Sequence, residues 1–142
     1  MLKISTTVAA LLAVLSAVPA IDGRAADKWP LRQEIDLSSG FGDYRQGHFH
    51  FGVDLRTGGR IGRSINSPVD GYIWRVRTAY TGYGKALYIK GDDDHYYIFG
   101  HLSDFSGPVD QAVKAAQLAA RRYVQDMEFP EDSIRVGRGE FI

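Results

Sequence analysis

The sequence predicts a mainly β domain built on antiparallel sheet, with one helix near residues 109–125. Short runs rich in Tyr, Ile, Val and Trp recur between residues 29 and 105, and clusters of Gly, Asp and Ser separate them. An Ala-rich stretch follows residue 107. Short strands divided by such turns are typical of antiparallel sheets and sandwiches. We therefore expect strand pairing to organise one domain over residues 26–142.

Residues 1–25 have the pattern of a secretory signal peptide. Lys3 supplies a positive charge, residues 8–18 form an apolar run, and small residues follow it. Cleavage after Ala20 is the first choice, and a site near Ala25 or Ala26 is the second. The run is shorter than the roughly 20 residues that span a bilayer, and it lacks the second, charged face of an amphipathic helix. We expect export to the periplasm or the extracellular space, with no membrane span.

Four segments after the signal peptide predict strands, and a short fifth strand is expected at residues 134–136. The four are residues 33–37, 71–79, 85–90 and 95–102. In the second of them the side chains of Tyr72, Trp74 and Val76 alternate with those of Ile73, Arg75 and Arg77. This alternation predicts one buried face and one wetter face.

The helix is predicted from composition and spacing. Residues 109–125 are rich in Ala, Lys, Gln, Leu and Arg, and Pro108 suits a helix start. One apolar stripe at helical spacing consists of Val109, Val113, Ala116 and Ala120. Residues 127–133, which contain Pro130, are expected to form a loop.

Charge and cysteine content exclude several classes of function. The chain has 17 Lys and Arg against 17 Asp and Glu, so it carries no basic excess for nucleic acid or an anionic membrane. It has no cysteine, which excludes disulfides, thiolate zinc sites, iron–sulfur clusters and cysteine nucleophiles. Any metal must therefore be held by carboxylates and by histidines, of which the chain has four: His48, His50, His95 and His101.

His50 and Asp54 are the candidate metal ligands. In an extended strand these residues would point to the same face but lie roughly 13 Å apart, since each residue advances about 3.3 Å. Zinc binds N and O donors at about 2.0–2.2 Å, so the chain must bend between them. Gly52 is the residue able to bend it without a steric penalty. His101 ends an aromatic strand, and strand pairing could bring it toward the same pocket.

The same residues have structural explanations that spacing alone leaves open. The alternating residues 48–51 could be the polar and apolar faces of a half-buried strand, and Asp54 could cap the turn before residues 58–59. Residues 92–94 are three adjacent aspartates without the spaced ligands of a calcium loop. His95 follows them in a turn and is expected in solvent.

Gly42, His48, His50 and Asp54 resemble the first motif of the cupins, which would imply a metal-binding β-barrel. The likeness is partial. An aspartate stands where that motif has glutamate, and His101 lacks the Pro and Gly frame of the second cupin motif.

Five blocks between residues 38 and 105 carry a more extensive resemblance. They are Ser39-Gly40-Phe41-Gly42, His48-Phe49-His50-Phe51-Gly52-Val53-Asp54-Leu55, Val69-Asp70-Gly71-Tyr72-Ile73, Gly82-Tyr83-Gly84-Lys85-Ala86-Leu87-Tyr88-Ile89 and Tyr97-Ile98-Phe99-Gly100-His101-Leu102. In this order the blocks resemble the lysostaphin-like, LytM-type zinc endopeptidases. The resemblance implies a small antiparallel fold of the duplicated hybrid motif type, with a zinc ion in a narrow groove.

The resemblance also implies roles for single residues. His50 matches the first zinc ligand, Asp54 the second, and His101 a catalytic histidine that is not a ligand. The family's third ligand belongs to a His-x-His pair near the domain's end, and no such pair follows His101. Residues 135–142 look like the segment leading into that pair, so we expect a C-terminally truncated chain. A natural terminus packed into the sheet is the alternative. Relative to compact members, about residues 104–133 are an insertion that carries the helix.

The implied function is zinc-dependent cleavage of peptide cross-links in peptidoglycan, with the stem peptides as substrate. A groove edged by Tyr80, Tyr83 and Tyr97 would grip an extended peptide, although these rings equally suit ordinary sheet packing. The alternative is a catalytically inactive LytM-like module that binds or activates an envelope partner. The presence of His50, Asp54 and His101 favours the enzyme.

Overall fold

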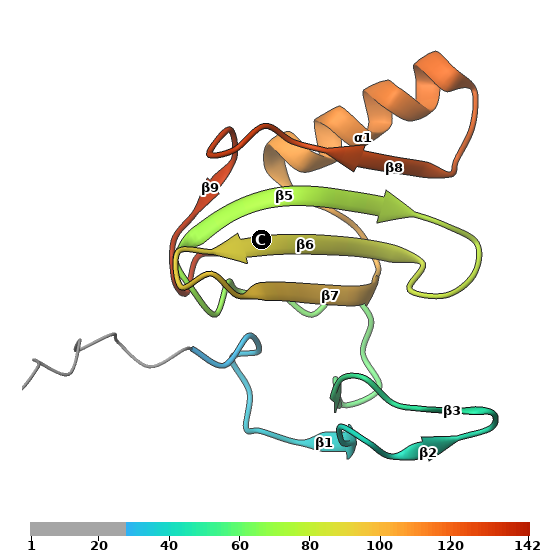
Figure 1. The fold of residues 1–142 in the computed structure, drawn as a ribbon, viewed down its shortest axis with the longest axis vertical. Helices are drawn as coiled ribbons and strands as arrows, with labels where there is room; N and C mark the ends of the chain where they lie inside the picture. The colour runs from blue at the N-terminus through green and yellow to red at the C-terminus, as the bar shows by residue number, and fades with distance from the viewer. Residues whose placement is uncertain (1–27) are drawn as a thin grey trace, which may run out of the picture.

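A computed structural model describes residues 28–142 of the chain, and the predicted signal peptide lies outside this range. The described part is mainly β, with antiparallel sheets and one α-helix, which confirms the predicted fold class (Figure 1). It divides into a five-stranded sheet backed by the helix and a smaller region of two strand pairs.

The five-stranded sheet contains the second half of the described chain. Its strands are β5 (Gly71–Thr78), β6 (Lys85–Gly91), β7 (Tyr96–Leu102), β8 (Gln125–Glu128) and β9 (Arg135–Val136). The order is β7-β6-β5-β8, β9 also pairs with β5, and every pairing is antiparallel. The terminal strands β7 and β8 do not pair with each other, so the sheet is open.

The hydrophobic core lies between this sheet and helix α1 (Gly107–Ala120), which lies behind strand β8 in Figure 1. Ile89 of β6 and Val76 of β5 are fully buried, and Val109 and Val113 pack on them from the helix. The predicted apolar stripe therefore holds over the first turns of α1. Ala120 is exposed, because the end of the helix extends beyond the sheet.

The predicted alternation along β5 is wrong at its centre. Ile73, Val76 and Thr78 are buried, whereas Trp74 is only partly buried. The pairing with β6 shifts by one residue between Ile73 and Arg75. Such a bulge moves the following side chains to the opposite face, which is why Val76 shares the core face with Ile73.

The predicted helix is too long at its C-terminal end. Arg121 has a left-handed backbone conformation, with φ of 47°, and its N–H and that of Arg122 bond to the carbonyls of Leu118 and Gln117. These bonds end the helix. Gln125 begins strand β8, so the stretch expected to be the helix end and a loop supplies a sheet strand instead.

A buried hydroxyl fixes β8 against β5. Thr78 Oγ1 donates to the carbonyl of Tyr123 at 2.6 Å and accepts the N–H of Gln125 at 2.9 Å. These two residues are 45 and 47 positions from Thr78 along the chain. Such a contact between distant residues leaves no local signal in the sequence, which is why pattern analysis missed the strand.

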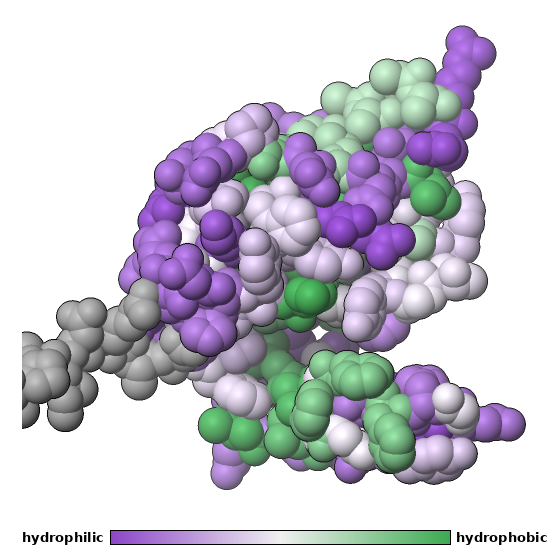
Figure 2. All heavy atoms as spheres, in the orientation of Figure 1, coloured by the Kyte–Doolittle hydropathy of each residue, from purple (hydrophilic) through white to green (hydrophobic). Residues whose placement is uncertain are grey.

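The strand-pair region, residues 35–61, lies beside the sheet on the side of β7 (Figure 1). Strand β1 (Leu37–Ser39) pairs with β4 (Asp54–Leu55), and β2 (Tyr44–Arg45) pairs with β3 (His48–Phe49). The strand predicted at residues 33–37 thus begins at Leu37 and reaches Ser39. The exposed large apolar side chains of this region are Ile35, Leu37, Phe41, Tyr44, Phe49, Phe51, Val53 and Ile61. Figure 2 shows hydrophobic side chains gathered on this part of the surface.

The last described residues run against the segment that links the two regions. Phe141 forms an isolated antiparallel bridge with Asn66, and the N–H of Ile142 bonds to the carbonyl of Ile65 at 3.0 Å. Ile142 also packs against the core cluster. Residues 141–142 are therefore packed against the folded domain.

Candidate metal centre

The structure brings His50 and Asp54 together. His50 follows β3, Asp54 begins β4, and residues 50–53 between the two strands belong to neither. The chain bends there, so His50 Nε2 lies 3.4 Å from Asp54 Oδ1 instead of the extended distance. The side chain of His50 is 15% exposed and that of Asp54 is 40% exposed. The pair therefore lies at the surface, and solvent reaches the Asp54 carboxylate more than the His50 ring.

Backbone contacts determine which nitrogen of His50 faces Asp54. His50 Nδ1 lies 2.9 Å from the carbonyl oxygen of Gly40 and 3.2 Å from Ser39 Oγ. A carbonyl only accepts hydrogen bonds, so Nδ1 carries the proton and donates it to Gly40. The lone pair of a neutral His50 then sits on Nε2 and points toward a carboxylate oxygen. Two electron-rich atoms in this arrangement require a proton or a metal cation between them.

The separation of these two atoms fits a shared metal. Two atoms bonded to one tetrahedral zinc at 2.0–2.2 Å lie about 3.4 Å apart. A hydrogen bond from Nδ1 of a ligating histidine to a backbone carbonyl is the usual way in which proteins orient such a ligand. The geometry of His50 and Asp54 is thus suited to two of the four positions around one ion.

The loop that supports His50 was not predicted from the sequence. The carboxylate of Asp43 accepts the N–H of Gly40 at 2.8 Å and the hydroxyl of Ser39 at 2.9 Å, and these bonds lower the pKa of Asp43. The backbone N–H of His50 donates a hydrogen bond of 2.9 Å to the carbonyl of Asp43. The signal that could have found this loop is an aspartate three residues after Ser39-Gly40, because aspartate side chains commonly bond to backbone groups three or four residues earlier.

Arg45 is a second residue that the sequence did not single out. Its Nη2 forms an ion pair with Asp54 Oδ2, and the same nitrogen lies 3.3 Å from Ser39 Oγ. Asp54 therefore has one oxygen toward His50 and the other toward a guanidinium. This ion pair holds the carboxylate in position, and it also competes with any cation for the negative charge of Asp54.

Gly52 does not play the role that the sequence suggested. It does not adopt a positive φ, and a Cβ built on it would lie 3.6 Å from His50 Nε2, which is an ordinary contact. The bend is made without the freedom peculiar to glycine. A small side chain at this position would lie beside the candidate ligand nitrogen.

His101 lies at the end of β7 and has a strained backbone, with φ of 56°. Its N–H bonds to the carbonyl of Tyr83 at 2.8 Å, and its ring meets the ring of Tyr83 edge-on, with centroids 6.4 Å apart. Across residues 28–142 it makes no hydrogen bond or ion pair with His50 or Asp54. The structure thus joins two of the three predicted site residues and leaves the third on a separate strand.

Gly100 allows Tyr83 to approach His101. A Cβ on Gly100 would lie 3.0 Å from Tyr83 Cδ1, which is tighter than almost all real contacts. Of the three tyrosines expected to edge a groove, Tyr83 alone adjoins His101. Tyr80 stacks on Tyr123 with centroids 4.9 Å apart, and the hydroxyl of Tyr97 donates to Asp93 at 2.8 Å. The predicted set of three groove residues is therefore not supported.

Among the described residues, no group of three or more His, Asp or Glu side chains is arranged to hold a metal ion. The candidate centre accordingly supplies two protein ligands. The side chain of His95, predicted to be solvated, is 76% exposed, and its Nδ1 lies 3.3 Å from Asp93 Oδ2. No helix of residues 28–142 is long and apolar enough to cross a membrane.

No protein-family model, curated protein or solved structure matches the chain.

Proposed function

We propose that this chain belongs to a zinc-dependent endopeptidase of the lysostaphin-like, LytM type, which cleaves peptide cross-links of peptidoglycan. The observation that carries the proposal is the pairing of His50 Nε2 with Asp54 Oδ1 at 3.4 Å, with the imidazole oriented by the Gly40 carbonyl. These are the residues that the family resemblance identifies as the first two zinc ligands. The orientation of His50 and its distance from Asp54 are independent of that resemblance.

In this proposal His50 and Asp54 hold the ion. Zinc, when bound, supplies a Lewis acid and lowers the pKa of a coordinated water toward about 7. Asp54 would use Oδ1, which faces His50, while its Oδ2 stays paired with Arg45. His101 donates a hydrogen bond to the oxyanion that develops on the scissile carbonyl, or carries a proton to the leaving amine. Tyr83 holds the backbone of His101 through the 2.8 Å bond.

The proposal requires a third protein ligand in addition to His50 and Asp54, and a His-x-His pair following residue 142 would provide it. Two protein ligands bind zinc weakly, because structural zinc sites use four protein ligands and catalytic zinc sites use three. We therefore expect the 142-residue chain by itself to hold zinc weakly and to be inactive. Tight stoichiometric zinc in this form would contradict the proposed ligand set.

The test of the ligands is a zinc measurement on a chain extended through the next 40 or so codons of its gene. We expect the extended chain to bind one zinc ion and the variant His50→Ala to lose it, with about 100-fold weaker affinity or more. His95→Ala is the matched control, because this histidine is solvent-exposed and remote in sequence from the candidate ligands. Equal zinc in the His50→Ala variant and its parent would end the assignment.

Digestion of purified sacculi separates the enzyme from its alternative. Zinc-dependent release of cross-linked peptides supports the endopeptidase. Tight binding to sacculi without release supports the inactive LytM-like binding or activator module. The cupin alternative has less support, because the five-stranded sheet is open where a cupin would form a barrel.

The proposal also includes export to the periplasm or the extracellular space through residues 1–25. N-terminal sequencing of the secreted protein tests this export.

A further inference from the structure

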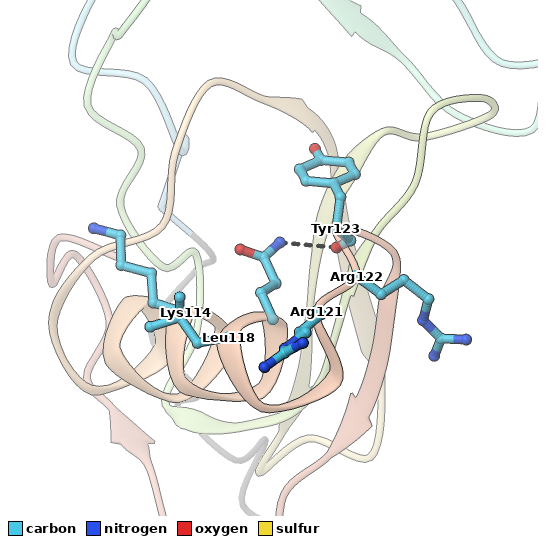
Figure 3. A pocket seen from close by; sticks show the side chains of 6 residues that line it. Lys114, Leu118, Arg121, Arg122 and Tyr123 are labelled. Atoms are coloured by element: carbon cyan, nitrogen blue, oxygen red, sulfur yellow. Dashed lines mark hydrogen bonds between the residues drawn. The ribbon is translucent and has the colours of Figure 1, made fainter.

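A shallow hollow of about 510 Å³ lies at the C-terminal end of α1, away from the candidate metal centre. It is lined by residues of the last helical turns and of the turn that follows: Lys114, Gln117, Leu118, Arg121, Arg122 and Tyr123. Gln117 and Tyr123 are joined across it by a hydrogen bond of 2.8 Å from the amide to the carbonyl (Figure 3). Half of the lining residues are cationic and none is acidic.

The positive charge at this end of the helix is largely uncompensated. Lys114 pairs with Asp110 at 2.7 Å. Arg121 and Arg122 have no carboxylate of the described chain within ion-pair distance, and the only side-chain bond of Arg122 is from Nε to the carbonyl of Val124. Most arginines of the large sheet are paired, as Arg75 is with Asp126. In a chain whose formal charge is zero, this end of α1 is therefore a local excess of positive charge.

Apolar surface accompanies the charge. Leu118 is 79% exposed, and Tyr80, which stacks on Tyr123, is 80% exposed. Lys114 and Leu118 are four residues apart within α1, which places them on one side of the helix, and Arg121 follows at the left-handed residue that ends it. Cations next to a helix C-terminus stabilise its dipole. That explanation accounts for the arginines, but it does not account for a leucine and a tyrosine left in water beside them.

We propose that this surface, formed by Lys114, Leu118, Arg121, Arg122 and Tyr80, docks an acidic polypeptide segment in an extended or irregular conformation. Figure 3 shows the three cationic groups ending at separate places around the helix end, with Arg122 directed away from Arg121. They do not converge on one point, so a single small anion would meet one of them. An acidic segment with an apolar side chain can contact all of them and cover Leu118.

Charge complementarity favours a polypeptide over an anionic membrane. Stable attachment to a bilayer needs a larger polybasic cluster or a second anchor, and three cations around one leucine fall short of that. The proposal is independent of the metal centre and of the activity proposed for it.

The test uses fluorescence anisotropy of the 142-residue chain with a labelled synthetic peptide that is rich in glutamate and carries leucine. We expect saturable binding at low salt that weakens as the salt rises to about 0.3 M. The double variant Arg121→Glu with Arg122→Glu should bind about tenfold more weakly or worse, since attraction becomes repulsion. The conservative pair Arg121→Lys with Arg122→Lys should retain most of the affinity.

The matched control is Arg60→Glu with Arg63→Glu. It makes the same change in net charge on two exposed arginines, one of which also bonds through Nε to a backbone carbonyl. Equal weakening in this control would show non-specific attraction and overturn the proposal. So would unaltered binding in the Arg121 and Arg122 reversal, binding of a glutamine version of the peptide with the same affinity, or binding to phosphatidylglycerol vesicles without binding to the peptide.

Leu118→Ala tests the apolar contribution. We expect several-fold weaker binding, with unchanged circular dichroism, because the side chain is exposed and contributes little to the fold. Ile61→Ala, which removes a side chain that is 92% exposed in the strand-pair region, should leave the affinity unchanged. Equal effects of the two variants would contradict a localised docking surface.

Discussion

The five-stranded sheet and the strand-pair region are stabilised to very different degrees. The sheet buries Val76, Ile89 and their neighbours against α1. The strand-pair region has two-stranded sheets and leaves most of its large apolar side chains exposed, Phe41 at 74% and Phe51 at 78%. An isolated pair of short strands is marginally stable in water. Folding energy is therefore concentrated in one region, and the candidate metal ligands are in the other.

The difference shows how local order can arise without a core. The position of His50 depends on hydrogen bonds with Gly40 and Asp43, and that of Asp54 on Arg45. Such contacts at a surface contribute about 1 kcal/mol each or less. A bound cation would add to them, because metal binding to a folded site is also stabilisation of that site. We expect the strand-pair region to open more readily than the sheet and to become more ordered on binding metal.

The largest effect on the free energy of unfolding is expected when alanine replaces a buried side chain of the sheet, in comparison with an exposed side chain of the strand-pair region. Ile89→Ala removes a fully buried side chain and should lower the free energy of unfolding by about 2–5 kcal/mol. Phe51→Ala removes a larger but exposed side chain and should change it by about 0.5 kcal/mol or less. Urea unfolding followed by circular dichroism measures both. A comparable loss in the two variants would mean that the strand-pair region is part of one cooperative core.

A smaller effect is expected where β8 joins the sheet. Thr78→Val keeps the shape of the side chain but leaves the buried N–H of Gln125 without the Oγ1 acceptor. We expect a loss of about 1–3 kcal/mol, because an unpaired buried donor costs its full desolvation. Thr81→Val, in the exposed turn after β5, is the control. If the two variants unfold at the same urea concentration, the Thr78 hydroxyl does not hold β8.

An ion pair on the exposed face of the sheet should make the free energy of unfolding depend on pH. Hydrogen bonding and the charge of Arg75 lower the pKa of Asp126 below its ordinary value. A carboxyl whose pKa falls on folding stabilises the protein above its unfolded pKa of about 4, and this contribution disappears as the pH falls through the lowered value. For a partly exposed pair we expect about 0.5–1 kcal/mol.

Urea unfolding of Asp126→Asn and its parent at about pH 7 and about pH 2 checks this pH dependence. The difference between the two proteins should be present at neutral pH and nearly absent in acid. Glu131→Gln is the control, because Glu131 is exposed and belongs to none of the ion pairs found over residues 28–142. A difference that persists unchanged in acid would point to packing instead of charge.

The smallest effect concerns Arg45 and the candidate metal centre. Arg45→Gln removes the cation that pairs with Asp54 Oδ2. Because that pair is exposed, we expect zinc affinity of the extended chain to rise only two- to fivefold or so. Arg56→Gln, which breaks a comparable exposed pair with Asp36, should leave the affinity unchanged. Zinc affinity that falls in the Arg45 variant would mean that Arg45 is needed to hold Asp54 in place.

Patterns within the sequence predicted the long strands well. Strands β5, β6 and β7 fall where runs of aromatic and β-branched residues lie between turn signals, and the start of α1 follows Ser106 and precedes Pro108. Composition alone limited any metal site to histidine and carboxylate. His50 and Asp54 could be selected because only a few histidines exist and an acid follows one of them closely.

What the sequence by itself determined is the fold class, the three long strands, the helix start and the chemical nature of the candidate ligands, because period, turn residues and donor atoms are local properties. Tertiary structure alone decided that β8 is a strand, that a bulge turns Val76 inward, and that Arg45 shares Asp54 with His50. It also left Arg121 and Arg122, after the end of α1, without an ion-pair partner among residues 28–142. Each of these outcomes depends on how separate strands, turns and the helix meet, and those contacts exist only after folding.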